Sequence, residues 1–199
     1  DPYEIVNEYG LDQIRYFLFR EVPFGNDGDF SKNAIATRVN ADLSNNFGNL
    51  IQRILTFIVK NCNSEVSPPS NYTNDDKNLI KVFKDKSNEY FHYMENFQID
   101  KAIKSVMELL TNTNVYVDNQ APWNLKKTDS DRMQDVLFII SNIIIKSTIM
   151  LYPIIPDSSK KALSFFNMDY RNISFNNFDL LLSKKINIKN PYPLFPRID

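Results

Sequence analysis

The sequence has one cysteine and one histidine in 199 residues, Cys62 and His92. One cysteine cannot form an internal disulfide, and the two residues together supply too few ligands for a structural zinc site. Glycine is also scarce, and the four glycines form no phosphate-binding loop. We find no metal motif and no nucleophile motif. The chain therefore shows no catalytic machinery of its own, and its cysteine usage fits a reducing, cytoplasmic location.

A long uninterrupted hydrophobic run is also missing. The most apolar stretch, 136–151, is interrupted by Ser141, Asn142 and Lys146 among others. It therefore predicts a buried core helix rather than a membrane span. The sequence does not open with a charged start followed by an apolar segment, so it gives no indication of secretion. The formal net charge of −1 argues against a non-specific polyanion binder, so any nucleic-acid binding must come from a local patch.

What the sequence does contain is hydrophobic spacing typical of helices, in a composition that is 43% hydrophobic and 24% charged. This pattern predicts one sizeable all-α domain, a helical bundle. A loop is expected at 22–29, and a connection at 63–74. From Asn167 onward, prolines and asparagines predict an irregular, extended strap lying on the domain. The predicted helices begin at Pro2, at Leu11, after a Ser31 cap, at Asp75 or Asp76, at Ile99, after an Asp129 or Ser130 cap, and at Asp157.

The long helix predicted over 31–60 carries a polar stripe opposite its apolar face. Asn49 and Arg53 are one turn apart on this stripe and therefore side by side. A fixed amide and guanidinium can donate to base edges or bind phosphate. The alternative is an ordinary solvated helix face. Gly48, in the middle of this helix, costs roughly 1 kcal/mol relative to alanine, which a closely approaching partner or a neighbouring helix would explain.

The only tryptophan, Trp123, follows Pro122, which should stop the helix that precedes it. An indole fixed at a helix end beside Lys126 and Lys127 could stack on a nucleobase while the lysines meet phosphate. The alternative is that Trp123 closes the end of a helical core, with its N–H bonded to a carbonyl. The local sequence leaves both interpretations open.

Three segments, taken together, resemble the bacterial-type methionyl-tRNA synthetase family. Segments 39–43 and 49–53, Val-Asn-Ala-Asp-Leu and Asn-Leu-Ile-Gln-Arg, resemble the first helix of its anticodon-binding bundle. The segment Asp-Asn-Gln-Ala-Pro-Trp at 118–123 resembles the motif with its anticodon-reading tryptophan. The segment Pro-Leu-Phe-Pro-Arg-Ile at 193–198 resembles the end of its core enzyme, and the opening 1–31 resembles the region after its Lys-Met-Ser-Lys-Ser loop.

The resemblance implies a class I synthetase anticodon-binding bundle at 31–166, with a stem-contact segment at 1–30 and the strap at 167–199. It also implies that Trp123 stacks on the wobble base of a CAU anticodon. Pro122 would help to place the indole, and Asn49 and Arg53 would make polar contacts to anticodon bases. These groups should converge across neighbouring helices. Further contacts to tRNA are expected from Asn45, Gln52, Lys126 and Lys127.

The signature motifs of the family's adenylate chemistry are missing from the sequence, as are zinc-knuckle cysteines. The resemblance therefore implies a fragment without catalytic residues, inactive alone, whose parent enzyme carries a catalytic domain upstream and uses ATP and Mg²⁺. The expected partners are methionine tRNA and that catalytic domain, with no membrane. For the chain itself we expect no cofactor, no metal and a monomer.

Two other functions compete with this interpretation. The chain could belong to another class I synthetase, such as the isoleucyl, valyl, leucyl or cysteinyl enzyme, but the proline-tryptophan motif and the Leu-Phe-Pro-Arg-Ile run argue against these. It could instead be a helical protein-interaction module in which Trp123 and the aromatic-rich tail form a hot spot. That hypothesis predicts binding that is indifferent to the anticodon sequence.

Overall fold

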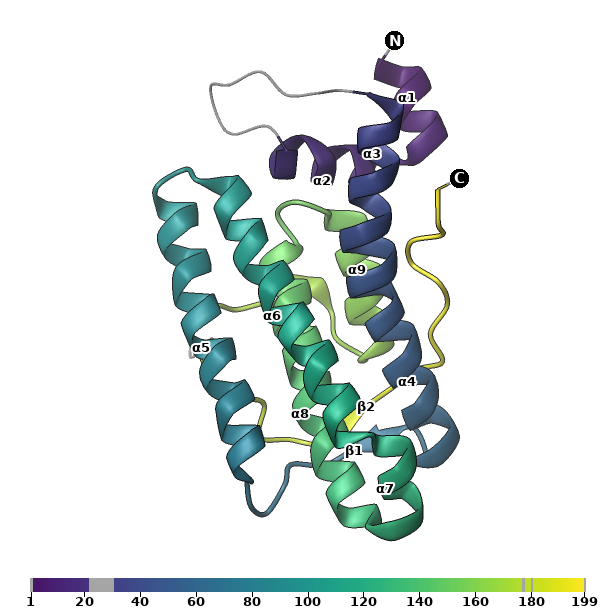
Figure 1. The fold of residues 1–199 in the computed structure, drawn as a ribbon, viewed down its shortest axis with the longest axis vertical. Helices are drawn as coiled ribbons and strands as arrows, with labels where there is room; N and C mark the ends of the chain where they lie inside the picture. The colour runs from purple at the N-terminus through teal and green to yellow at the C-terminus, as the bar shows by residue number, and fades with distance from the viewer. Residues whose placement is uncertain (1, 22–30, 177, 180, 199) are drawn as a thin grey trace.

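The computed structural model describes residues 2–21, 31–176, 178–179 and 181–198, so the loop expected at 22–29 lies outside the described residues. The architecture is the all-α bundle that the sequence predicts, elongated along the axes of its main helices (Figure 1). Helices α1 and α2 lie at one end of the bundle, and α7 lies at the other. The helices and strands are α1 Pro2–Tyr9, α2 Leu11–Glu21, α3 Lys32–Val39, the π-helix η1 Asn40–Gly48, α4 Asn49–Asn61, β1 Glu65–Val66, α5 Asn74–Glu95, α6 Ile99–Gln120, α7 Pro122–Thr128, α8 Ser130–Leu151, α9 Pro156–Phe165, the 3₁₀ helix η2 Tyr170–Asn172 and β2 Ile186–Asn187.

Helix α8 forms the centre of the core. Among the described residues it alone is long and apolar enough to cross a membrane, yet 89% of its most apolar window is buried inside the bundle. Two of its polar side chains, Asn142 and Thr148, find partners there. Asn142 donates to the Phe138 carbonyl at 2.9 Å and accepts from the Leu182 amide at 2.6 Å. The interrupted apolar stretch is thus a core helix, as its sequence predicts.

The long helix predicted over 31–60 is continuous from α3 to α4, but its middle is not α-helical. Ser31 caps it as expected, accepting from the Ala34 amide at 3.2 Å. From Asn40 to Gly48 the chain is a π-helix, and the Asn49 amide donates to the Ser44 carbonyl five residues back. A π-helix closes i→i+5 bonds and is rare over such a length. The apolar spacing of the sequence did not reveal it.

Asp42 ties this π-helix to helix α2. Its carboxylate accepts from the Tyr16 hydroxyl at 2.7 Å and lies 3.5 Å from Arg20 and 3.6 Å from Arg38. Tyr16 is fully buried, and burial is the main cause that raises the pKa of its hydroxyl well above the ordinary value. The hydroxyl therefore stays protonated and donates to Asp42 across the neutral range.

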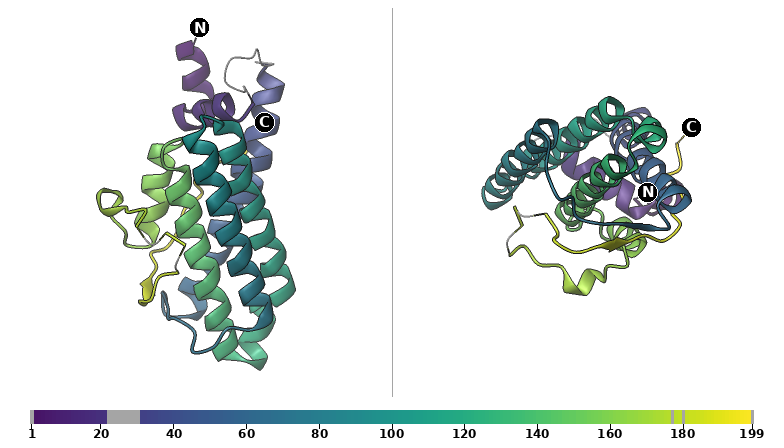
Figure 2. Two further views of the ribbon diagram at one scale, coloured as in Figure 1. Left: turned by 90° about the vertical axis from the view of Figure 1, so that its left-hand side faces the viewer. Right: turned by 90° about the horizontal axis from the view of Figure 1, so that it is seen from below.

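The segment 167–198 lies along one side of the bundle (Figure 2). Its described residues are mostly without regular secondary structure, as predicted, but they also include η2 and β2, which the sequence analysis did not predict. Strand β2 pairs antiparallel with β1, with Glu65 opposite Asn187 and Val66 opposite Ile186. This two-stranded ladder attaches the tail to the connection between α4 and α5.

The start of α5 differs from the prediction by one or two residues. Thr73 is the N-cap, and its hydroxyl accepts from the Asp76 amide while Asp76 accepts from the Thr73 amide. Neither Asp75 nor Asp76 begins the helix. A reciprocal capping box needs the cap three residues before the acidic side chain, which places the start at Asn74.

Candidate nucleic-acid interface

The junction between α6 and α7 fixes the position of Trp123. Helix α6 ends at Gln120, and Ala121 takes a left-handed conformation with φ of 44°. Pro122 ends α6 as the sequence predicts, but it is also the first residue of α7, which was not predicted. A proline is favoured at the first helical position, because its missing N–H would have no intrahelical partner there. Buried Pro122 thus holds the next residue at the outer surface.

Trp123 is 39% exposed, so it does not close the end of the core. It belongs to α7, at the end of the bundle opposite α1 and α2 (Figure 1). The guanidinium carbon of Arg53 lies 5.8 Å from the centroid of the indole. The structure therefore brings together Arg53 of α4 and Trp123 of α7, which are far apart in the sequence, and a cation–π contact holds the pair.

Arg53 is held in place by helix α6. Its Nη1 donates to Asp118 at 3.1 Å, and its Nη2 donates to the side-chain oxygen of Asn114 at 3.2 Å. Asn114 in turn donates to the side-chain oxygen of Asn46 in η1 at 2.9 Å. Sequence reasoning gave no role to Asn46, Asn114 or Asp118. The four-residue spacing of Asn114 and Asp118 places them on one face of α6, which is the signal that could have pointed to them.

Asn49 is exposed on the first turn of α4, one turn before Arg53. With Asn45, Gly48 and Gln52 it lines one wall of a hollow of about 250 Å³, and residues of the 193–197 segment line the other wall. Gln52 donates to the Thr56 hydroxyl at 3.3 Å, while its side-chain oxygen is buried and accepts no hydrogen bond from the described residues. The hollow is thus lined by the amide side chains of Asn45, Asn49 and Gln52, of which Asn49 is one helical turn from Arg53.

Lys126 and Lys127 are both exposed on α7, beyond Trp123. Neither forms an ion pair within the described part of the chain, whereas Arg53 is already paired with Asp118. The free positive charge of this surface therefore comes from the two lysines. In the described ranges no group of three or more histidine, cysteine, aspartate or glutamate residues is placed to hold a metal ion.

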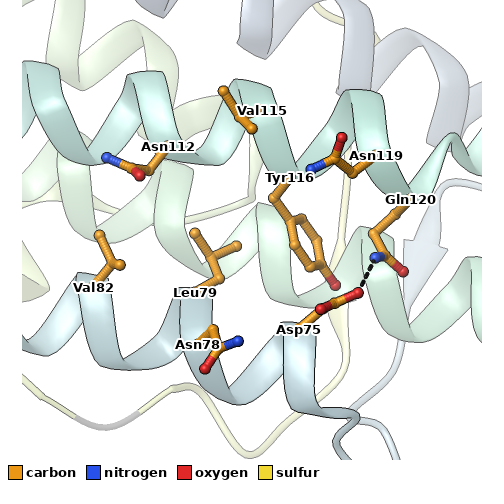
Figure 3. A pocket seen from close by; sticks show the side chains of 9 residues that line it. All are labelled: Asp75, Asn78, Leu79, Val82, Asn112, Val115, Tyr116, Asn119 and Gln120. Atoms are coloured by element: carbon orange, nitrogen blue, oxygen red, sulfur yellow. Dashed lines mark hydrogen bonds between the residues drawn. The ribbon is translucent and has the colours of Figure 1, made fainter.

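A second hollow, of about 210 Å³, lies between α5 and α6 (Figure 3). At its edge the Gln120 amide donates to Asp75 at 3.0 Å, and the Gln120 oxygen accepts from Arg132 at 2.7 Å. These two bonds attach the last residue of α6 to α5 and α8. Because Gln120 is held on both sides, the turn at Ala121 begins at a fixed position, and this helps to set the direction of α7.

Comparison with known proteins identifies the family of the chain. Residues 66–198 match the family model described as the anticodon binding domain of methionyl tRNA ligase, and residues 1–55 match the model of class I (M) tRNA synthetases. The methionine–tRNA ligase of Rickettsia conorii is 36% identical over 100% of this chain and 40% of its own length. That of Brucella suis is 38% identical over 99% of this chain and 38% of its own length.

A solved structure is similar as well. The crystal structure of the free form of Mycobacterium tuberculosis methionyl-tRNA synthetase superposes with a TM-score of 0.93 at 30% identity, covering 100% of this chain and 41% of that one. The chain thus spans about two fifths of the length of the relatives it matches. The family model covers most of the chain, including the α6–α7 junction with Trp123. The chain belongs to the family of anticodon-binding domains of methionyl-tRNA ligase.

Proposed function

We propose that this domain reads the CAU anticodon of methionine tRNA, and that it does so within a methionyl-tRNA synthetase that attaches methionine to tRNA with ATP and Mg²⁺. The observation that carries this proposal is the contact between Arg53 and Trp123 at 5.8 Å, on a surface that also exposes two unpaired lysines. An aromatic face, a fixed guanidinium and free cations are the groups that bind an unstacked loop of RNA.

Trp123 would stack on the wobble cytosine, with Pro122 and Ala121 setting the direction of the indole. One face of the ring is approached by Arg53, so the exposed part is available to a base. Stacking of this kind contributes on the order of 1–3 kcal/mol per base. It does not by itself choose one base, because every base has a π face. Discrimination must come from polar groups beside the ring.

Arg53 and Asn49 would supply those polar contacts. The bonds to Asp118 and Asn114 fix the plane of the guanidinium, which has five N–H donors and uses two in these bonds. Asn49 is exposed and lines the hollow together with Asn45 and Gln52. A two-point contact to a base edge discriminates by about 1–3 kcal/mol in DNA complexes, and a similar value is expected here.

Lys126 and Lys127 would bind phosphates of the anticodon loop. By holding that loop, the domain would orient the tRNA so that its acceptor end reaches a distant catalytic domain. Within the chain, we propose a stem-contact segment at 1–30, the anticodon-binding bundle at 31–166 and the strap at 167–199, and we expect a cytoplasmic monomer. The class I match over residues 1–55 supports a link to the remaining part of a synthetase.

Binding of a methionine anticodon stem-loop to the chain and to Trp123→Ala tests the proposal. With the original chain, we expect CAU to bind more tightly than a loop with the wobble cytosine changed. In Trp123→Ala, affinity for CAU should fall by about tenfold, as for the loss of one stacked base. Phe97→Ala is the matched control, because Phe97 is an aromatic residue that is 75% exposed at the other end of α6.

Equal binding of both loops by the original chain would refute anticodon reading. It would favour the alternative of a protein-interaction module, which is indifferent to the anticodon. A cytosine preference that survives in Trp123→Ala would leave anticodon reading in place but remove Trp123 from it.

A further inference from the structure

The π-helix η1 contacts the strap at both of its ends. At the first end, the Asn40 side chain donates to the Ile198 carbonyl at 2.7 Å and accepts from the Ile198 amide at 2.9 Å. At the last end, a Cβ atom on Gly48 would come within 3.3 Å of the Phe195 ring. Phe195 is 5% exposed, and its ring centroid lies 6.0 Å from that of Phe47. The strap thus spans the whole π-helical segment.

The structure leaves little room for a side chain at position 48, which is occupied by Gly48. A Cβ atom there would lie 2.9 Å from the Leu43 carbonyl oxygen, five residues back, as well as against Phe195. The first of these contacts arises from the helix itself, and the second arises from the strap. The tighter restriction at Gly48 is therefore the carbonyl of its own helix, and the strap, rather than another helix, is the neighbouring segment that approaches it. Glycine allows both approaches at once.

The π-helix determines which way the recognition residues point. Its i→i+5 bonds differ from those of an α-helix by one residue. One residue of an α-helix corresponds to a rotation of about 100° around the axis. The π register runs directly into α4, since the Asn49 amide bonds to the Ser44 carbonyl. A return to α-helical bonding would turn Asn49 away from the hollow or Arg53 away from Asn114 and Asp118.

We infer that the strap is a positioning element for anticodon reading: Phe195, together with the Asn40 bonds to Ile198, holds the π-helical register that points Asn49 and Arg53 at the RNA. This inference rests on the proposed function, and it adds residues that touch no base. Asp42 holds the same π-helix from the side of α2, through Tyr16 and Arg20. The strap supplies the restraint next to the hollow, where its residues 193–195 and Arg197 form the facing wall.

The test compares Phe195→Ala and Asn40→Ala with Tyr192→Ala in the full 199-residue chain. Tyr192 is the matched control, since it is an aromatic residue of the same strap but packs on Phe165 of α9, with ring centroids 4.9 Å apart. We expect the preference for a CAU stem-loop over one with a changed wobble base to fall about tenfold in the first two variants, as for one lost base contact. The control should keep the preference of the original chain.

Amide hydrogen exchange provides a readout that does not depend on RNA. Exchange should become faster at residues 40–49 in Phe195→Ala and in Asn40→Ala, and should be unchanged there in Tyr192→Ala. Asn40→Ala removes two hydrogen bonds with a smaller loss of packing, so it serves if Phe195→Ala does not fold. Thermal unfolding of each variant separates a local effect from general destabilisation.

Two outcomes overturn the inference. One is unchanged exchange at 40–49 in both strap variants, and the other is an unchanged base preference despite faster exchange. If the original chain itself shows no preference for CAU, the proposed function fails, and this inference fails with it. If the original chain prefers CAU and this preference persists in Phe195→Ala and Asn40→Ala, the proposed function stands and only the role of the strap is refuted.

Discussion

Arg53 joins three helices through a single planar side chain. It bonds to Asp118 and Asn114 of α6 and lies over the indole of α7, while its Nε is buried and donates to none of the described residues. A lysine would keep the charge but lose the fixed plane. In Arg53→Lys we therefore expect the free energy of binding to the CAU stem-loop to become less favourable by about 1–3 kcal/mol. Titration of the labelled stem-loop measures this change.

Folding should be little affected in Arg53→Lys. Asp118 is 62% exposed, and such ion pairs contribute about 1 kcal/mol or less. Arg171→Lys is the control, because Arg171 pairs with Asp169 on the strap in a similar two-point contact. RNA affinity equal to that of the original chain in Arg53→Lys would show that charge alone is needed at this position.

At the residue scale, the sequence indicated Trp123 and the Asn49–Arg53 pair as candidate site residues, because helical spacing and a proline are local signals. It did not predict the supports of Arg53. Whether Asn46 meets Asn114 depends on which face of α6 packs against η1, and this register is set by the whole core. The roles of the predicted residues in binding RNA stay predictions.

At the scale of the helices, a buried carboxylate joins α5, α6 and α8. Asp76 is fully buried and accepts from the Thr73 amide, from the Tyr116 hydroxyl at 2.5 Å and from Arg132 at 2.7 Å. In Asp76→Asn, Arg132 keeps its charge and loses its partner. We expect the free energy of unfolding to fall by about 3–5 kcal/mol, as for other broken buried pairs. Denaturant unfolding measures this, and exposed Asp75→Asn is the control.

The same carboxylate gives the stability a pH dependence. Burial alone would raise the pKa of Asp76, but hydrogen bonds from Arg132, Tyr116 and Thr73 hold that pKa below its ordinary value. The stabilisation is therefore full above the pKa of an unfolded-state aspartate and is lost as the pH falls through the lower pKa of the folded state. The difference in unfolding free energy between the original chain and Asp76→Asn should shrink in this acid range. A constant difference would contradict the assignment.

Helix caps were predictable because they depend on a few neighbouring residues, as Ser31 shows. The π-helix was not, because Val39, Leu43 and Phe47 have the spacing of an ordinary α-helix. Its register is imposed by contacts distant in sequence, from Asp42 to α2 and from Gly48 to Phe195. Helix α7 was missed since it is too short to show a periodic pattern.

For the whole molecule, the net charge of −1 sets the salt dependence of binding. Since the chain offers no general attraction, phosphate contacts require a local patch, and we propose that Lys126 and Lys127 form it. With one phosphate each, log K against log salt concentration should have a slope of about −1.4. Removing one lysine should reduce the slope by about 0.7. Lys101→Ala, at the opposite end of α6, is the control, and an unchanged slope in Lys126→Ala and in Lys127→Ala would place the phosphates elsewhere.

Because Trp123 is the only tryptophan of the chain and lies at the surface against Arg53, all indole fluorescence of the chain comes from the proposed recognition site. Excitation beyond the tyrosine band therefore reports the arrival of a base, or a displacement of Arg53, without any attached dye. The domain carries its own optical probe at the point where its selectivity is proposed to reside.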